Sequence, residues 1–197
     1  MIPFVFQLAI LLFFTGFPSS QALQVNNTIY IISSAETPSL GRPGLTPIGQ
    51  QRAQQCIPNV FAKFNIGLII SCNGTAAGSE DEDGDGQGCA AAAPTAQPFA
   101  TQLGLSLTTC GAGDDANEGC ASRLINAFAK NSTGSVLIVW DFLQMEDLFE
   151  NLDIDDEEDD DDDNEDGTPH YDIITTALKT KVIGQSSMNC TGIDGPA

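Results

Sequence analysis

Apolar and polar residues alternate in blocks along the chain. The short apolar runs, such as Ile66–Ser71, are almost continuous, which is typical of strands buried on both faces. The stretches between them place apolar residues three or four positions apart, as in amphipathic helices. The pattern predicts, in order, strand 28–33, helix 47–63, strand 66–71, helix 94–103, strand 105–109, helix 120–130, strand 135–140, helix 144–152 and strand 171–175.

This alternation of strands and helices predicts an α/β fold with three layers, α/β/α, around a mostly parallel sheet. The second element shows its start clearly, because Thr46 can cap a helix whose first turn holds Pro47. Pro58 should shorten or kink that helix. In such folds the ligand site lies at the carboxyl ends of the strands, which directs attention to the loop after Ser33.

The amino-terminal residues 1–22 have the pattern of a secretory signal peptide. Phe4–Phe17 is almost wholly apolar, and Ser20-Gln21-Ala22 forms a cleavage site of the small-x-small type. A membrane anchor is the alternative, but the apolar run is short for a span. We therefore expect a secreted, extracellular protein whose single domain covers residues 23–197, with no membrane span after cleavage.

Cysteines and glycosylation sequons agree with this compartment. Six cysteines in a secreted chain indicate three disulfides, for which fifteen pairings exist. The short loop between Cys110 and Cys120 favours that pair, and Cys56 with Cys190 and Cys72 with Cys89 complete one possible arrangement. Four Asn-x-Ser/Thr sequons predict a glycoprotein, at Asn26, Asn73, Asn131 and Asn189.

Acidic residues outnumber basic ones by 27 to 7, giving a net charge of −20. Such a chain repels nucleic acid and has few cations with which to hold phosphate. Residues 74–92 and 153–169 are expected to be acidic, disordered loops. Weak binding of divalent cations by these runs is the alternative to plain solvation.

Motifs for a cofactor or metal are missing. Asp81–Gly86 imitates the start of a calcium loop, but Ala92 stands at the twelfth position, where a bidentate Glu is needed. The sequence has no Gly-rich phosphate loop after a strand, no paired-His metal motif and no Cys-x-x-Cys. We therefore predict no cofactor and no metal.

Several segments form a recognisable series: Ala35-Glu36, Gly44–Ala53, Pro98–Leu105, Val136–Trp140, Tyr171–Ile174 and Asn189–Gly195. Together they resemble the histidine phosphatase superfamily, also called phosphoglycerate mutase-like, and particularly its small secreted fungal members. In that family the first strand ends in Arg-His-Gly/Ala-Glu, and a segment Gly-Leu-Thr/Ser-x-x-Gly-x-x-Arg-Ala follows. The resemblance implies a phosphoglycerate mutase-like fold over most of the chain.

The resemblance also implies that the catalytic groups are absent. In the family one His attacks phosphorus, while two Arg and a second His hold the phosphoryl oxygens. This chain has Ser33 and Ser34 in place of the Arg-His pair, Ala91 at the second Arg, and Phe142 at the second His. The single His, His170, lies far along the chain. The resemblance therefore implies a pseudoenzyme with no catalytic residues at these positions.

Other chemistry in the same cleft is the alternative. Ser34 would need a nearby base to act as a nucleophile, and no His at a family position is available. Glu36 and Asp141 could form a carboxylate pair for acid/base catalysis. Arg42 and Arg52 are the nearest cations, and Arg52 should fix the fold by pairing with an acid. Trp140, with Phe142, is expected at the mouth of the cleft. We predict a binding protein for an extracellular protein or small ligand; residual phosphatase or other hydrolase activity is the alternative.

Overall fold

A single sheet organises the part of the chain that the computed structural model describes, residues 23, 25–39, 44–73, 89–112, 119–155 and 170–194. Its strand order is β3-β2-β4-β1-β5-β6. The strands are β1 Thr28–Ser33, β2 Ile66–Asn73, β3 Leu107–Gly111, β4 Ser135–Trp140, β5 Ile173–Leu178 and β6 Lys181–Ser187. The first four run parallel, and β5 and β6 are antiparallel additions next to β1. The predicted α/β class with a mostly parallel sheet is confirmed.

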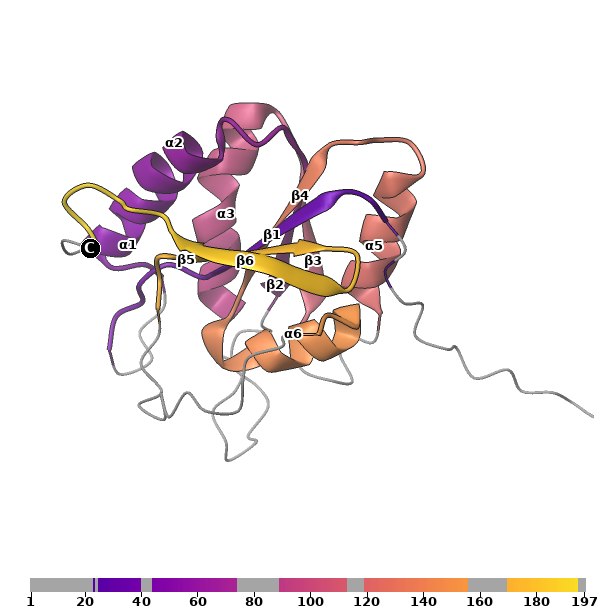
Figure 1. Cartoon of the computed structure of the whole chain (residues 1–197). Coiled ribbons are helices and arrows are strands. Elements are labelled where there is room, and N and C mark those ends of the chain that lie inside the picture. The colour runs from indigo at the N-terminus through magenta and orange to yellow at the C-terminus, as the bar shows by residue number, and fades with distance from the viewer. Residues whose placement is uncertain are drawn as a thin grey trace, which may run out of the picture.

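Helices cover both faces of this sheet (Figure 1). They are α1 Pro47–Gln51, η1 Arg52–Cys56, α2 Ile57–Phe61, α3 Cys89–Leu103, α5 Cys120–Ala129, η2 Phe142–Gln144 and α6 Met145–Leu152. On one face the ring of Tyr30 of β1 packs edge-to-face against Phe61 and tilted against Phe64, and Phe61 contacts Phe99 of α3. On the other face Gly67 of β2 lies against a side chain of α5. The layers are thus joined by buried aromatic and aliphatic side chains, each worth about 1.5–3 kcal/mol of burial.

The first helical run begins as predicted but contains a wider turn. The hydroxyl of Thr46 accepts a hydrogen bond from the backbone N–H of Gly49 at 3.0 Å, so Thr46 is the N-cap. Before Pro58 the chain adopts a π-helical segment, in which Ile57 donates to the carbonyl of Arg52. Proline lacks an N–H and crowds the carbonyl four residues earlier, so an irregular turn before Pro58 is expected. The interruption predicted at Pro58 is therefore local, and the run continues to Phe61.

Helix α3 begins at Cys89, earlier than the predicted Pro94. Residues 89–92, expected in a disordered loop, are helical because the alanine run has high helix propensity and because a disulfide ties Cys89 to Cys72 of β2. Strand β3 begins at Leu107 rather than at residue 105. Residues 74–88 of the expected loop, with the calcium-like motif, lie outside the described residues.

Strand β6 was missed by the sequence reasoning, and β5 extends to Leu178 rather than 175. The side chains of β6 are mostly exposed, so the strand has no apolar face that a sequence pattern could reveal. The register with β5 shifts around Ile183, which is 59% exposed. Such a bulge bends an edge strand and discourages pairing with other chains.

The start of the second acidic loop is also ordered, contrary to the expectation for 153–169. The N–H of Asp155 donates to the carbonyl of Thr180 at 2.9 Å, and that of Val182 donates to the carbonyl of Asp155. These bonds use edge groups of the β5–β6 hairpin that would otherwise be unpaired. Residues 156–169 lie outside the described residues.

All six cysteines are paired: Cys56 with Cys190, Cys72 with Cys89, and Cys110 with Cys120. This is the arrangement set out above, and it is confirmed. The four sequon asparagines, Asn26, Asn73, Asn131 and Asn189, are all exposed. The predicted signal peptide, residues 1–22, lies outside the described part. Within that part, no helix has the length and apolarity needed to cross a membrane.

Candidate functional site

The carboxyl ends of β1 and β4 lie side by side and bring together four of the residues singled out above. Ser33 is in register with Trp140, and the N–H of Ser34 donates to the carbonyl of Trp140 at 2.6 Å. Asp141 follows directly and is buried. Ser33 and Ser34 are each 5% exposed. The two serines therefore lie at the carboxyl end of β1. This end of the strands, called the carboxyl edge below, is where an α/β fold places its ligand site.

Helix α3 supplies the next contact, through a residue that the sequence reasoning did not single out. The N–H of Ala35 donates to the Thr95 hydroxyl at 2.9 Å, and that hydroxyl donates to the carbonyl of Ala91 at 2.7 Å. Ala91 is thus near the end of β1, as expected, but it presents only a methyl group. A Thr that bonds the carbonyl four residues earlier is common in helices, so nothing in the sequence marked Thr95.

Among the described residues, Arg52 is the cation close to this end of the strands, and it is enclosed. Its Nε lies 3.1 Å from both carboxylate oxygens of Glu36, and its Nη2 lies 2.6 Å from Oε1 of Glu36 and 2.8 Å from Oδ1 of Asp194. Its side chain is 4% exposed. Burial alone would lower the pKa of Arg52, but the hydrogen bonds and charges of Glu36 and Asp194 outweigh it and raise that pKa. The predicted pairing of Arg52 with an acid is confirmed.

Glu36 has a structural task in this cluster. Its oxygens accept three hydrogen bonds from Arg52, and its backbone carbonyl accepts from the N–H of Thr46 at 2.8 Å. A methyl group added to Gly49 would collide with the same carbonyl, so glycine is needed where α1 approaches the loop. The forked guanidinium therefore ties Glu36 to the first helical run, which disfavours a role as a free acid or base.

Asp141 also has a local structural role. It caps η2, because its Oδ1 accepts the N–H of Leu143 at 2.9 Å. Phe142, the first residue of η2, is half-buried, whereas Trp140 is fully buried and its Nε1 has no hydrogen-bond partner. Trp140 thus packs into the core instead of lining the cleft as expected.

His170 and Tyr171, which follow the acidic run, also lie at the carboxyl end of β1. The hydroxyl of Ser33 donates to the backbone carbonyl of His170 at 3.4 Å. The single histidine, which lies far along the chain, therefore has its backbone beside the end of β1, although 137 positions separate the two residues. Tyr171 follows, and the pKa of its phenol is raised by burial and by the charges of Glu36 and Asp141, with Arg52 opposing. No sequence signal could have revealed this approach.

With Asp194 in place, the charges at this end of the strands do not suit a further anion. The carboxylates of Glu36, Asp141 and Asp194 against the guanidinium of Arg52 give −3 + 1 = −2. Arg42 lies outside the described residues. No group of three or more His, Cys, Asp or Glu in the described residues could hold a metal ion.

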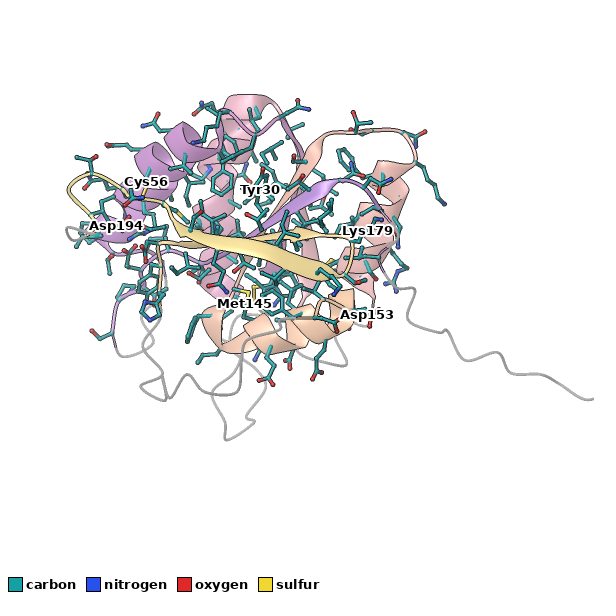
Figure 2. All side chains as sticks on the ribbon, viewed as in Figure 1. Tyr30, Cys56, Met145, Asp153, Lys179 and Asp194 are labelled. Atoms are coloured by element: carbon teal, nitrogen blue, oxygen red, sulfur yellow. A yellow bond between two sulfur atoms is a disulfide. The ribbon has the colours of Figure 1, made fainter. Side chains whose placement is uncertain are left out.

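Figure 2 shows where the carboxyl-terminal partner of Arg52 lies: Asp194 and Cys56 are both labelled close to the first helical run.

Sequence comparisons give no assignment: no protein-family model matches the chain, and no curated protein matches it. Among solved structures, the chain is similar to a protein of Agrobacterium tumefaciens that is provisionally assigned as the phosphohistidine phosphatase SixA. The identity is 16%, the match covers 82% of this chain and 97% of that chain, and the TM-score is 0.48. At these values the similarity carries no conclusion about activity, which has to be sought in the residues themselves.

Proposed function

We propose that the protein is a secreted, catalytically degenerate relative of the histidine phosphatases, a pseudoenzyme that binds an extracellular protein or a small ligand. The observation that carries this proposal is the state of Arg52, the cation beside the first loop, which is already bound by two carboxylates. Phosphoryl transfer needs a nucleophile and preplaced cations that face the developing charge. Ala91 and Phe142 supply neither, and the hydroxyls of Ser33 and Ser34 become nucleophiles only when a base takes their proton.

Secretion is supported by three features. Residues 1–22 have the pattern of a signal peptide, all six cysteines are paired, and the sequon asparagines are exposed. Disulfides persist mainly in oxidising compartments. The net charge of −20 disfavours nucleic acid as the partner.

The proposal predicts that the purified protein does not hydrolyse phosphomonoesters. We expect the release of p-nitrophenol from p-nitrophenyl phosphate to be equal for the native protein and for Ser34→Ala purified in the same way. The matched variant separates intrinsic turnover from a contaminating phosphatase. A native rate at least tenfold above that of Ser34→Ala would refute the proposal.

A serine hydrolase is the second candidate, and one contact favours it. The hydroxyl of Ser33 donates to the backbone carbonyl of His170, so the backbone of the chain's one histidine lies beside the end of β1. A serine becomes a nucleophile when a base takes its proton. Asp141 would be the nearest buried carboxylate on the neighbouring strand.

Ester hydrolysis distinguishes this second candidate from the binding protein. On p-nitrophenyl acetate, we expect His170→Ala, which alters an exposed residue, to match the native protein because no group at the site is activated. Lys130→Ala, also exposed, is the control for a surface substitution. A tenfold loss confined to His170→Ala would establish the hydrolase instead.

A further inference from the structure

The guanidinium of Arg52 offers two edges to acceptors, and they are filled unequally. Glu36 takes the edge formed by Nε and Nη2, where both of its oxygens are used. At the other edge Nη2 donates to Oδ1 of Asp194 at 2.8 Å, and Nη1 donates to the sulfur of Cys190 at 3.3 Å. Sulfur is a weak acceptor. This second edge therefore holds one oxygen where a bidentate oxyanion would place two.

Asp194 reaches this edge from a small turn near the end of the described chain. Its Oδ2 accepts the N–H of Cys190 at 2.6 Å, and its own N–H donates to the carbonyl of Cys190 at 3.0 Å. Thr191 and Gly192 between them are exposed, and open space surrounds Gly192, which has φ +79°. The Cys56–Cys190 disulfide holds the chain before the turn. Lifting residues 191–194 would break these hydrogen bonds and the packing of Ile193 against the core, and would leave the disulfide in place.

We propose that Asp194 is an internal ligand that closes an oxyanion site on the Nη1–Nη2 edge of Arg52. When the turn lifts, a carboxylate or phosphate group of a ligand takes the place of the Asp194 carboxylate and makes the paired hydrogen bonds that Asp194 makes only in part. The inference rests on the proposed function, since it gives the binding protein a ligand class. The bound Asp194 keeps the site closed to weakly competing anions.

The test compares Asp194→Ala with Asp172→Ala. Both variants remove one carboxylate close to the carboxyl-terminal segment, but Asp172 accepts from the hydroxyl of Ser187 and forms no ion pair with an arginine of the described residues. Inorganic phosphate and acetate are titrated into each protein and into the native chain, with the side-chain N–H signals of Arg52 followed by NMR. We expect Asp194→Ala to bind at least one of the anions tenfold more tightly than Asp172→Ala and the native chain.

Each outcome decides the matter. Tighter binding of phosphate alone, or of acetate alone, supports the site and identifies the group it takes. Equal affinities of Asp194→Ala and Asp172→Ala for both anions overturn the proposal. If Asp194→Ala melts below the assay temperature, Asp194→Asn replaces it, because the amide keeps an acceptor for the Cys190 N–H and removes the charge. Failure here leaves phosphomonoester turnover unchanged, so it is distinguishable from failure of the proposed function.

Discussion

Replacing Arg52 with Met lowers the free energy of unfolding by about 3–5 kcal/mol, the usual consequence of removing one partner from a buried ion pair. The side chain is 4% exposed, and the carboxylates of Glu36 and Asp194 are 18% and 11% exposed. Without the guanidinium these two acids repel each other in a poorly hydrated place. Methionine fills most of the volume, so the loss reports charge and hydrogen bonding rather than a cavity.

Urea unfolding followed by circular dichroism measures this effect, with Lys130→Met as the control. Lys130 is also a cation replaced by the same residue, but it is exposed, and we expect a change within about 0.5 kcal/mol. Arg52→Lys should recover only part of the loss, because an ammonium cannot make the forked contacts to Glu36. An Arg52→Met variant within 1 kcal/mol of the native protein would show that the cluster can be replaced by apolar packing.

The sequence predicted those parts of the fold that have a strong local signal. Strands 28–33 and 135–140 were placed correctly because their runs of β-branched residues are buried on both faces. Strand β6 has no apolar face, and its pairing with β5 depends on a turn and a bulge. The predicted start of helix α3 was too late, because its first turn depends partly on a disulfide, which is a tertiary constraint.

The candidate site was predictable only for those residues that lie together in one segment of the sequence. Ser33, Ser34 and Glu36 follow one strand, so their shared location follows from the order of the chain. Asp194 and His170 reach the same edge across 142 and 137 positions. Such approaches are decided by the folding of the whole chain, and a single sequence contains no periodic pattern that reports them. The pairing of Arg52 was expected, but its second partner was not.

At the carboxyl ends of β1 and β4, the charged side chains serve the fold. Thr46 caps the first helical run, Gly49 allows close approach to the loop, and Arg52 holds that loop to the carboxyl-terminal turn. Each contact positions backbone rather than presenting a reactive group to solvent.

Removal of the Cys56–Cys190 disulfide should have the largest effect on stability. It closes a loop with a sequence separation of 134, whereas Cys110–Cys120 closes one of 10. Loop-closure entropy gives about 5 kcal/mol for the first and about 3 kcal/mol for the second. The double substitution Cys56→Ala/Cys190→Ala also releases the turn that carries Asp194, so part of the Arg52 cluster is lost with it.

The matched control is Cys110→Ala/Cys120→Ala, which likewise removes one disulfide and leaves no free thiol. Urea unfolding of both double variants under non-reducing conditions should give the lower midpoint for Cys56→Ala/Cys190→Ala, by an amount corresponding to about 2 kcal/mol or more. An equal or smaller loss for the long-range pair would contradict the prediction. It would mean that the carboxyl-terminal segment stays in place through Asp194 and Arg52 alone, and that the ion pair, not the disulfide, holds this end of the chain.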